Sequence, residues 1–84
     1  ILDSMGWVLY RQGDYEQSIK YLRQAYEKFP DPEVAAHLGE VLWVSGDQKA
    51  AMEIWQGALL KDPEHRVLVA TIKRLGVTAL DVGH

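Results

Sequence analysis

Apolar residues recur every three to four positions along most of the chain, which is the spacing that gathers side chains on one face of an α-helix. The pattern predicts five helices and no strand. The first runs from the start of the chain to Gln12-Gly13, the second from Asp14 to just before Pro30, the third from about Pro32 to Val44, the fourth from Asp47 to Asp62, and the fifth from about Pro63 to Leu75.

The expected helix ends carry residues suited to stopping one helix and starting the next. Gly13-Asp14 and Gly46-Asp47 each combine a glycine, which reaches positive φ readily, with an aspartate that can cap the following helix. Asp31-Pro32 places a cap before a proline at the first helical position, where its missing N–H is not needed. These signals predict short turns between consecutive helices.

The chain also repeats itself. Gly6 returns as Gly39, a spacing of 33 residues (39 − 6), and the two glycine–aspartate turns, Ala25 and Ala58, and Pro30 and Pro63 keep the same spacing. Self-similarity near 34 residues is typical of helical repeat arrays. We therefore expect a single domain over residues 1–75, made of repeat one (1–31), repeat two (32–62) and a capping helix (63–75). Residues 76–84 lack periodicity and are predicted to form a mobile tail.

Composition narrows the range of functions. The nine basic residues are scattered among twelve acidic ones, for a net charge of −3, which disfavours nucleic acid as a partner. No apolar run approaches the roughly 20 residues that span a bilayer, so we expect no membrane contact by this segment. The absence of cysteine excludes disulfides and thiolate metal sites. Because Ile1 opens the chain inside an expected helix, we interpret the segment as part of a longer protein.

The recurring residues resemble the tetratricopeptide repeat pattern. Each copy has a large aliphatic residue and glycine, then a small residue with a bulky residue four positions later, then alanine and proline. The first copy supplies Leu2, Met5-Gly6, Leu9, Ser18, Leu22, Ala25 and Pro30, and the second supplies Ala35, Leu38-Gly39, Leu42, Ala51, Trp55, Ala58 and Pro63. The resemblance implies an all-α fold, a right-handed α-solenoid fragment of two helix-turn-helix repeats plus the capping helix, with Trp55 in the core.

A closer resemblance covers residues 2–10 and 30–43. These stretches are similar to the C-terminal repeats of bacterial outer-membrane tetratricopeptide lipoproteins, a family that includes adaptors for a periplasmic carboxyl-terminal processing protease. If the resemblance extends to the parent protein, that protein has a signal sequence and a lipidated cysteine and lies at the periplasmic face of the outer membrane. The residues themselves leave the localisation open.

The same family resemblance implies that the first helix of each repeat lines a concave groove. Candidate partner-binding residues are those left on these helices once the core face is assigned, and they comprise Asp3, Trp7, Tyr10, Arg11, Glu33, Ala36, His37, Glu40, Trp43 and Val44. Tyr10 and Trp43 occupy equivalent positions and could grip an apolar side chain. Alternatively, both rings only fill the contact between neighbouring repeats.

The sequence does not favour a carboxylate-binding clamp, a metal site or a catalytic site. The Lys, Asn and Arg clamp that grips a terminal carboxylate in some members of the family is missing, because its positions carry Asp3, Trp7, His37 and Glu40. The histidines lack metal-ligand spacing, so no metal or other cofactor is expected. Glu33, His37 and Glu40 share a helix face, but an open groove does not exclude water from a reaction, and the chain is predicted not to be an enzyme.

The sequence therefore predicts a protein–protein interaction module, a scaffold or adaptor segment that binds a protein or peptide. A structural alternative remains open. In it, the aromatic residues and the exposed end of the helical array associate with a second copy and form a homo-oligomer.

Overall fold

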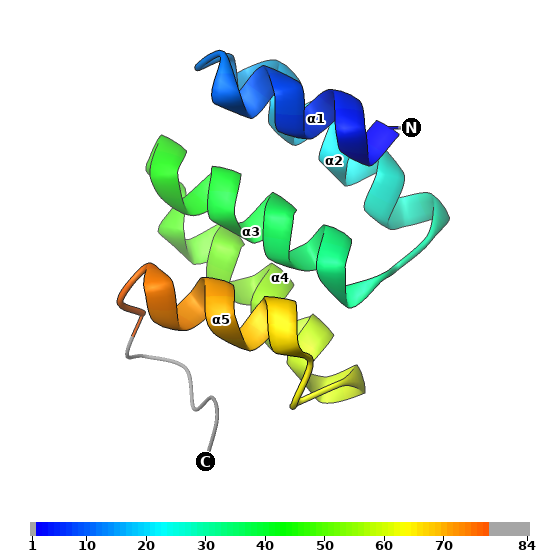
Figure 1. Cartoon of the computed structure of the whole chain (residues 1–84), viewed down its shortest axis with the longest axis vertical. Helices are drawn as coiled ribbons and strands as arrows, with labels where there is room; N and C mark the ends of the chain where they lie inside the picture. The colour runs from blue at the N-terminus through cyan, green and yellow to red at the C-terminus, as the bar shows by residue number, and fades with distance from the viewer. Residues whose placement is uncertain (1, 78–84) are drawn as a thin grey trace.

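The computed structural model describes residues 2–77 of the chain, with side chains from Met5 onward. Within this range the protein is all helical, as the sequence predicts. The helices are α1 (Leu2–Arg11), α2 (Tyr15–Lys28), α3 (Pro32–Ser45), α4 (Gln48–Lys61) and α5 (Arg66–Arg74). They form two helical hairpins, α1/α2 and α3/α4, followed by α5 against α3 (Figure 1).

The two glycine–aspartate turns form as predicted. Gly13 and Gly46 have φ values of 86° and 106°, and the backbone N–H of the following aspartate donates to the helix just ended. These bonds join Asp14 to Leu9 and Asp47 to Leu42, both at 2.9 Å. Each aspartate then accepts a hydrogen bond from a backbone N–H of the next helix. One residue pair therefore closes one helix and opens the next.

The predicted start of the fifth helix is wrong by three residues. Helix α5 begins at Arg66, and His65 caps it by accepting the backbone N–H of Leu68 at Nδ1, 3.4 Å away. Asp62 cannot start a helix because it ends α4, donating its N–H to the Ala58 carbonyl. Pro63 thus corresponds to Pro30, which lies before α3. It does not correspond to Pro32, which is the first residue of α3.

The first two residues of the predicted tail, Gly76 and Val77, form an ordered turn after α5. Gly76 adopts φ 74°, and the N–H of Val77 donates to the Ile72 carbonyl at 3.2 Å, which repeats the turn geometry of Gly13 and Gly46. The Val77 side chain is buried in the core. The predicted tail of residues 76–84 therefore begins with a turn at Gly76 and a buried Val77, while residues 78–84 lie outside the described range and their mobility stays a prediction.

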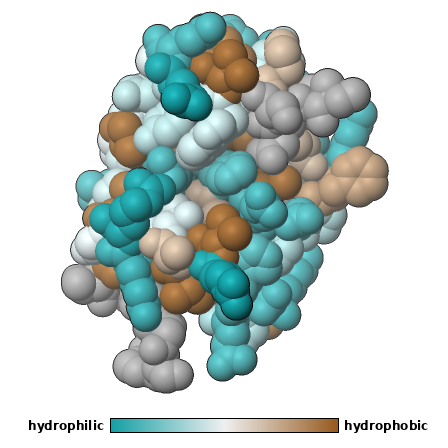
Figure 2. All heavy atoms as spheres, viewed as in Figure 1, coloured by the Kyte–Doolittle hydropathy of each residue, from teal (hydrophilic) through white to brown (hydrophobic). Residues whose placement is uncertain are grey.

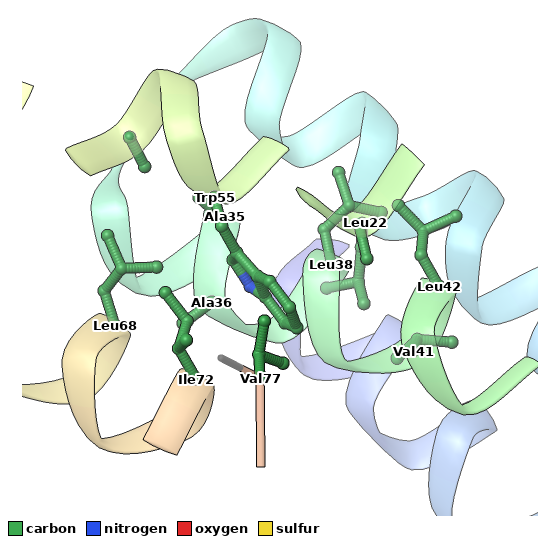
Figure 3. Packing of buried hydrophobic residues seen from close by; sticks show 12 residues of the cluster. Leu22, Ala35, Ala36, Leu38, Val41, Leu42, Trp55, Leu68, Ile72 and Val77 are labelled. Atoms are coloured by element: carbon green, nitrogen blue, oxygen red, sulfur yellow. The ribbon is translucent and has the colours of Figure 1, made fainter. Parts of the chain in front are cut away.

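The core is organised around α3. Its apolar residues meet Leu22 of α2, Trp55 of α4, and Leu68 and Ile72 of α5, all fully buried (Figure 3). Gly39 makes the α3/α4 contact possible because a Cβ at this position would collide with the Trp55 indole. The predicted roles of Gly39 and Trp55 are both confirmed.

In the first hairpin, too, a glycine lets two helices pack closely. A Cβ on Gly6 would lie 2.6 Å from Leu22 Cγ, and the Ser18 hydroxyl donates to the Gly6 carbonyl at 2.6 Å. Ser18 is the small residue of the repeat pattern, and it is fully buried. The two small residues therefore let α1 lie directly on α2, as the sequence predicts.

Candidate partner-binding face

Three helices share one side of the molecule. In Figure 1, α1, α3 and α5 lie on the viewer's side, with α2 and α4 behind them. We call this side the α1/α3/α5 face. It corresponds to the first helix of each repeat, where the sequence places the candidate binding residues. Figure 2 shows that this face mixes hydrophilic and hydrophobic side chains without a continuous apolar surface.

An aromatic cluster joins α1 to α3 on this face. The rings of Trp7 and His37 stack with centroids 4.5 Å apart and planes 30° from parallel, and Trp7 also lies 5.0 Å from Tyr10. Tyr10 continues the cluster to Tyr15 at the start of α2, 5.6 Å away. All four side chains are partly buried. Three predicted residues, Trp7, Tyr10 and His37, are therefore brought together in one cluster that remains partly accessible.

Trp43 belongs to a different cluster. Its ring lies 5.7 Å from that of Trp55 in the core, with planes 34° apart. Although Tyr10 and Trp43 hold equivalent repeat positions, none of the ring contacts found among the described residues joins them. Both side chains pack partly against the core, which favours the repeat-filling interpretation for their buried portions. Val44, next to Trp43, is exposed and offers an apolar contact beside it.

Glu40 faces the protein rather than the solvent. Its side chain is 6% exposed and forms an ion pair with Arg74 of α5, in which Arg74 Nη2 donates to Glu40 Oε1. The Tyr10 hydroxyl also donates to Glu40. A buried carboxylate needs such compensation, because removing an unpaired charge from water costs several kcal/mol. Glu40, expected to contact a partner, is thus engaged within the protein.

The environment of Tyr10 shifts its ionisation. Burial raises the pKa of Tyr10 to about 12, and the hydrogen bond to Glu40 and the electrostatic effects of Glu40 and Tyr15 act in the same direction. Arg74 opposes these effects. The hydroxyl is therefore a stable hydrogen-bond donor at neutral pH.

Arg74, like Tyr15, is a residue of this site that sequence reasoning missed. It lies 34 positions after Glu40, and its side chain is 59% exposed. That separation, close to one repeat length, places the two residues on neighbouring repeats. The repeat period could therefore have suggested the pair, but a lone arginine near a helix end looks like an ordinary solvated residue.

The remaining candidates are distributed unevenly. Arg11 and Glu33 are exposed, whereas Ala36 is fully buried and cannot reach a partner. The side chain of Asp3 lies outside the described residues. Glu33, His37 and Glu40 share a helix face but have different surroundings, because Glu40 is paired with Tyr10 and Arg74 while Glu33 is exposed.

Within the described part of the chain, no group of three or more His, Cys, Asp or Glu side chains is placed to hold a metal ion. None of the described helices combines the length and hydropathy needed to cross a bilayer.

Paired antiparallel helices that repeat at 33 residues and pack through small residues define an α-helical repeat protein. Residues 4–65 match the tetratricopeptide repeat family, and the chain belongs to that family. Proteins of this family generally mediate protein–protein interactions.

A curated relative agrees with this assignment. The chain is 65% identical over 40 residues to the TPR repeat-containing protein PA4667 of Pseudomonas aeruginosa. That match covers 48% of the chain but 7% of the relative's length.

Proposed function

We propose that this chain is a protein-interaction module that binds a peptide or protein segment on its α1/α3/α5 face. The observation that carries the proposal is the partly exposed cluster of Trp7, Tyr10 and His37 between two repeats. Large aromatic side chains bury much area with little loss of rotamer freedom, and such anchors can contribute roughly 2 kcal/mol or more to binding.

Charge contributes less to this proposal. Glu40 and Arg74 already satisfy one another, and Arg11 and Glu33 are exposed groups of opposite sign. Exposed charge pairs contribute about 1 kcal/mol or less and weaken further in salt. We therefore expect affinity to change little with ionic strength.

The test is affinity for a captured partner. The chain, immobilised, is used to isolate a partner, and binding is then measured for Trp7→Ala, Tyr10→Phe, Trp43→Ala and Arg11→Ala at low and high salt. Trp7→Ala should weaken binding most, and Arg11→Ala should have little effect. A steep loss of affinity with salt, or a loss confined to Arg11→Ala, would contradict an aromatic binding face. Melting curves of each variant separate lost binding from lost folding.

We propose that the parent protein is a lipid-anchored adaptor at the periplasmic face of the outer membrane that serves a carboxyl-terminal processing protease. The support is the similarity of residues 2–10 and 30–43 to the C-terminal repeats of such lipoproteins. Fractionation of cells that make the full-length parent tests this, and recovery in the cytoplasm would rule it out.

A specific observation also favours the self-assembly alternative. Met5 and Val8 of α1 are 46% and 54% exposed, whereas their equivalents one repeat later, Leu38 and Val41, are fully buried. The first repeat covers α3, but no described helix covers the matching side of α1. We propose that, if the chain associates with itself, it does so through Met5 and Val8.

Light scattering on the isolated chain distinguishes this alternative. A dimer mass that returns to a monomer mass in the double variant Met5→Lys/Val8→Lys would support self-association. A monomer over a wide concentration range would exclude it.

A further inference from the structure

One carboxylate lies at the junction of three helices. Glu40 belongs to α3, its hydrogen-bond donor Tyr10 belongs to α1, and its ion-pair partner Arg74 belongs to α5. The three residues therefore link the three helices of the α1/α3/α5 face through one buried group.

The link matters most for α1. This helix packs along α2 but meets α3 at few positions, so the backbone contact between α1 and α3 is slight. Among the described side chains, the stacked rings of Trp7 and His37 join the two helices, as does the hydrogen bond from Tyr10 to Glu40. The orientation of α1 on α3 therefore depends on a small number of side chains.

The energetics of a buried charge give this link its specificity. Glu40 is 4% exposed as a residue, so a helix shift that separated it from Tyr10 or Arg74 would leave a buried carboxylate undercompensated. An apolar contact tolerates sliding, whereas a hydrogen bond loses its strength when its angle or distance changes. A satisfied polar group at a helix junction thus selects one arrangement of the helices.

We infer that Glu40 is a positioning residue: by holding Tyr10 and Arg74 it fixes α1 and α5 against α3 and so sets the geometry of the Trp7, Tyr10 and His37 cluster. The inference rests on the proposed function only in taking that cluster as the binding face. Its readouts need no partner.

The experiment compares Glu40→Gln and Glu40→Ala with the unchanged chain by NMR, all at the same pH. The readout is the chemical shift of the His37 ring protons, which lie over the Trp7 ring in the native stack. Glu40→Ala should move these protons toward unstacked values. Glu40→Gln keeps the volume and an acceptor for Tyr10 but loses the charge facing Arg74, and it should produce a smaller shift.

Two further readouts report separately on the two side chains that Glu40 holds, Tyr10 and Arg74. The pKa of Tyr10, which is raised partly by Glu40, should fall in both variants, while burial and Tyr15 continue to raise it and the charge of Arg74 to lower it. Amide exchange in α5 should become about tenfold faster, the change expected when one charge-assisted hydrogen bond is lost.

Glu53→Gln is the matched control, because it removes a carboxylate at an exposed position of α4, a helix to which none of the three linked residues belongs. It should leave all three readouts unchanged. If Glu40→Ala does not fold, the three readouts are compared between Glu40→Gln and the unchanged chain. Folded variants with native His37 shifts, a native Tyr10 pKa and native exchange in α5 would overturn the inference. A second outcome would contradict the proposed function alone. In it, the chemical shifts of the His37 ring protons change in the Glu40 variants, but Trp7→Ala binds the partner as tightly as the unchanged chain.

Discussion

Two glycines inside helices differ in what surrounds them. At Gly39 a Cβ would collide with the Trp55 indole, whereas at Gly57 a Cβ would meet nothing within 4 Å. Both residues carry the same entropic disadvantage in a helix, yet only Gly39 is required by packing. The surroundings of a residue therefore determine whether its glycine stabilises or weakens the fold.

Gly39→Ala should destabilise the protein by about 1–3 kcal/mol, because the added methyl forces α3 away from Trp55. Gly57→Ala should stabilise it by about 0.5–1 kcal/mol, because alanine favours the helix and the site is open. Urea unfolding of both variants measures the two changes. Changes of the same sign would show that one of these surroundings is wrongly described.

Tyr10 predicts a pH dependence of stability in alkali. Its pKa is raised from 10.0 to about 12 in the folded protein, so the fold favours the neutral hydroxyl. This contribution is fully present below about pH 10 and is lost as the pH rises through 12. Tyr10→Phe has no ionisable group at this position and should lose less stability over that interval. Denaturant unfolding at pH 8, 10 and 11.5 measures the difference between the two proteins, and parallel profiles would argue against the raised pKa.

At the scale of the elements, helix ends are set by local chemistry. Asp47 accepts the Ala50 backbone N–H at 3.2 Å and so caps α4. Asp47→Ala should destabilise the protein by about 1 kcal/mol, because this orphan N–H loses its acceptor. Asp47→Asn keeps an acceptor and should restore most of the loss. Thermal melting of the two variants is the measurement, and equal melting temperatures for the alanine and native proteins would mean that the cap does not contribute.

The start of α5 illustrates what a local signal leaves open. Asp62-Pro63 has the same residue types as Asp31-Pro32, and both pairs satisfy the rule for a helix start. Asp62, however, ends α4, so a turn separates it from α5 and His65 becomes the cap. The internal repeat pairs Pro63 with Pro30, and this alignment would have corrected the boundary. A motif therefore needs its position in the repeat before its role is clear.

At the scale of the whole molecule, Trp55 holds the second repeat together. It is fully buried, lies against Gly39 and contacts the Trp43 ring. Trp55→Ala should lower the free energy of unfolding by roughly 3–5 kcal/mol. This is a large share of the total for a typical domain, which is about 5–15 kcal/mol. We expect the melting temperature of the variant, followed by circular dichroism, to fall sharply. Trp55→Phe should remain folded, and a Trp55→Ala variant with native melting would contradict the core position.

The sequence by itself determined the helix content, the repeat and the turns at Gly13 and Gly46. These features depend on local conformational preference and on a hydrophobic period that can be counted along the chain. Glycine can reach positive φ, and an aspartate can cap the next helix, whatever the rest of the fold does. The repetition then doubled each of these signals and made the fold predictable.

Only the tertiary structure decided which face residues are free to meet a partner. Glu40 and Glu33 lie on the same helix and look alike in the sequence, yet Glu40 is buried by Tyr10 and Arg74 while Glu33 is exposed. Likewise Tyr10 and Trp43 hold equivalent repeat positions but have different ring neighbours. The reason is physical: burial and pairing depend on side chains contributed by neighbouring repeats, and their approach is fixed only when the helices pack.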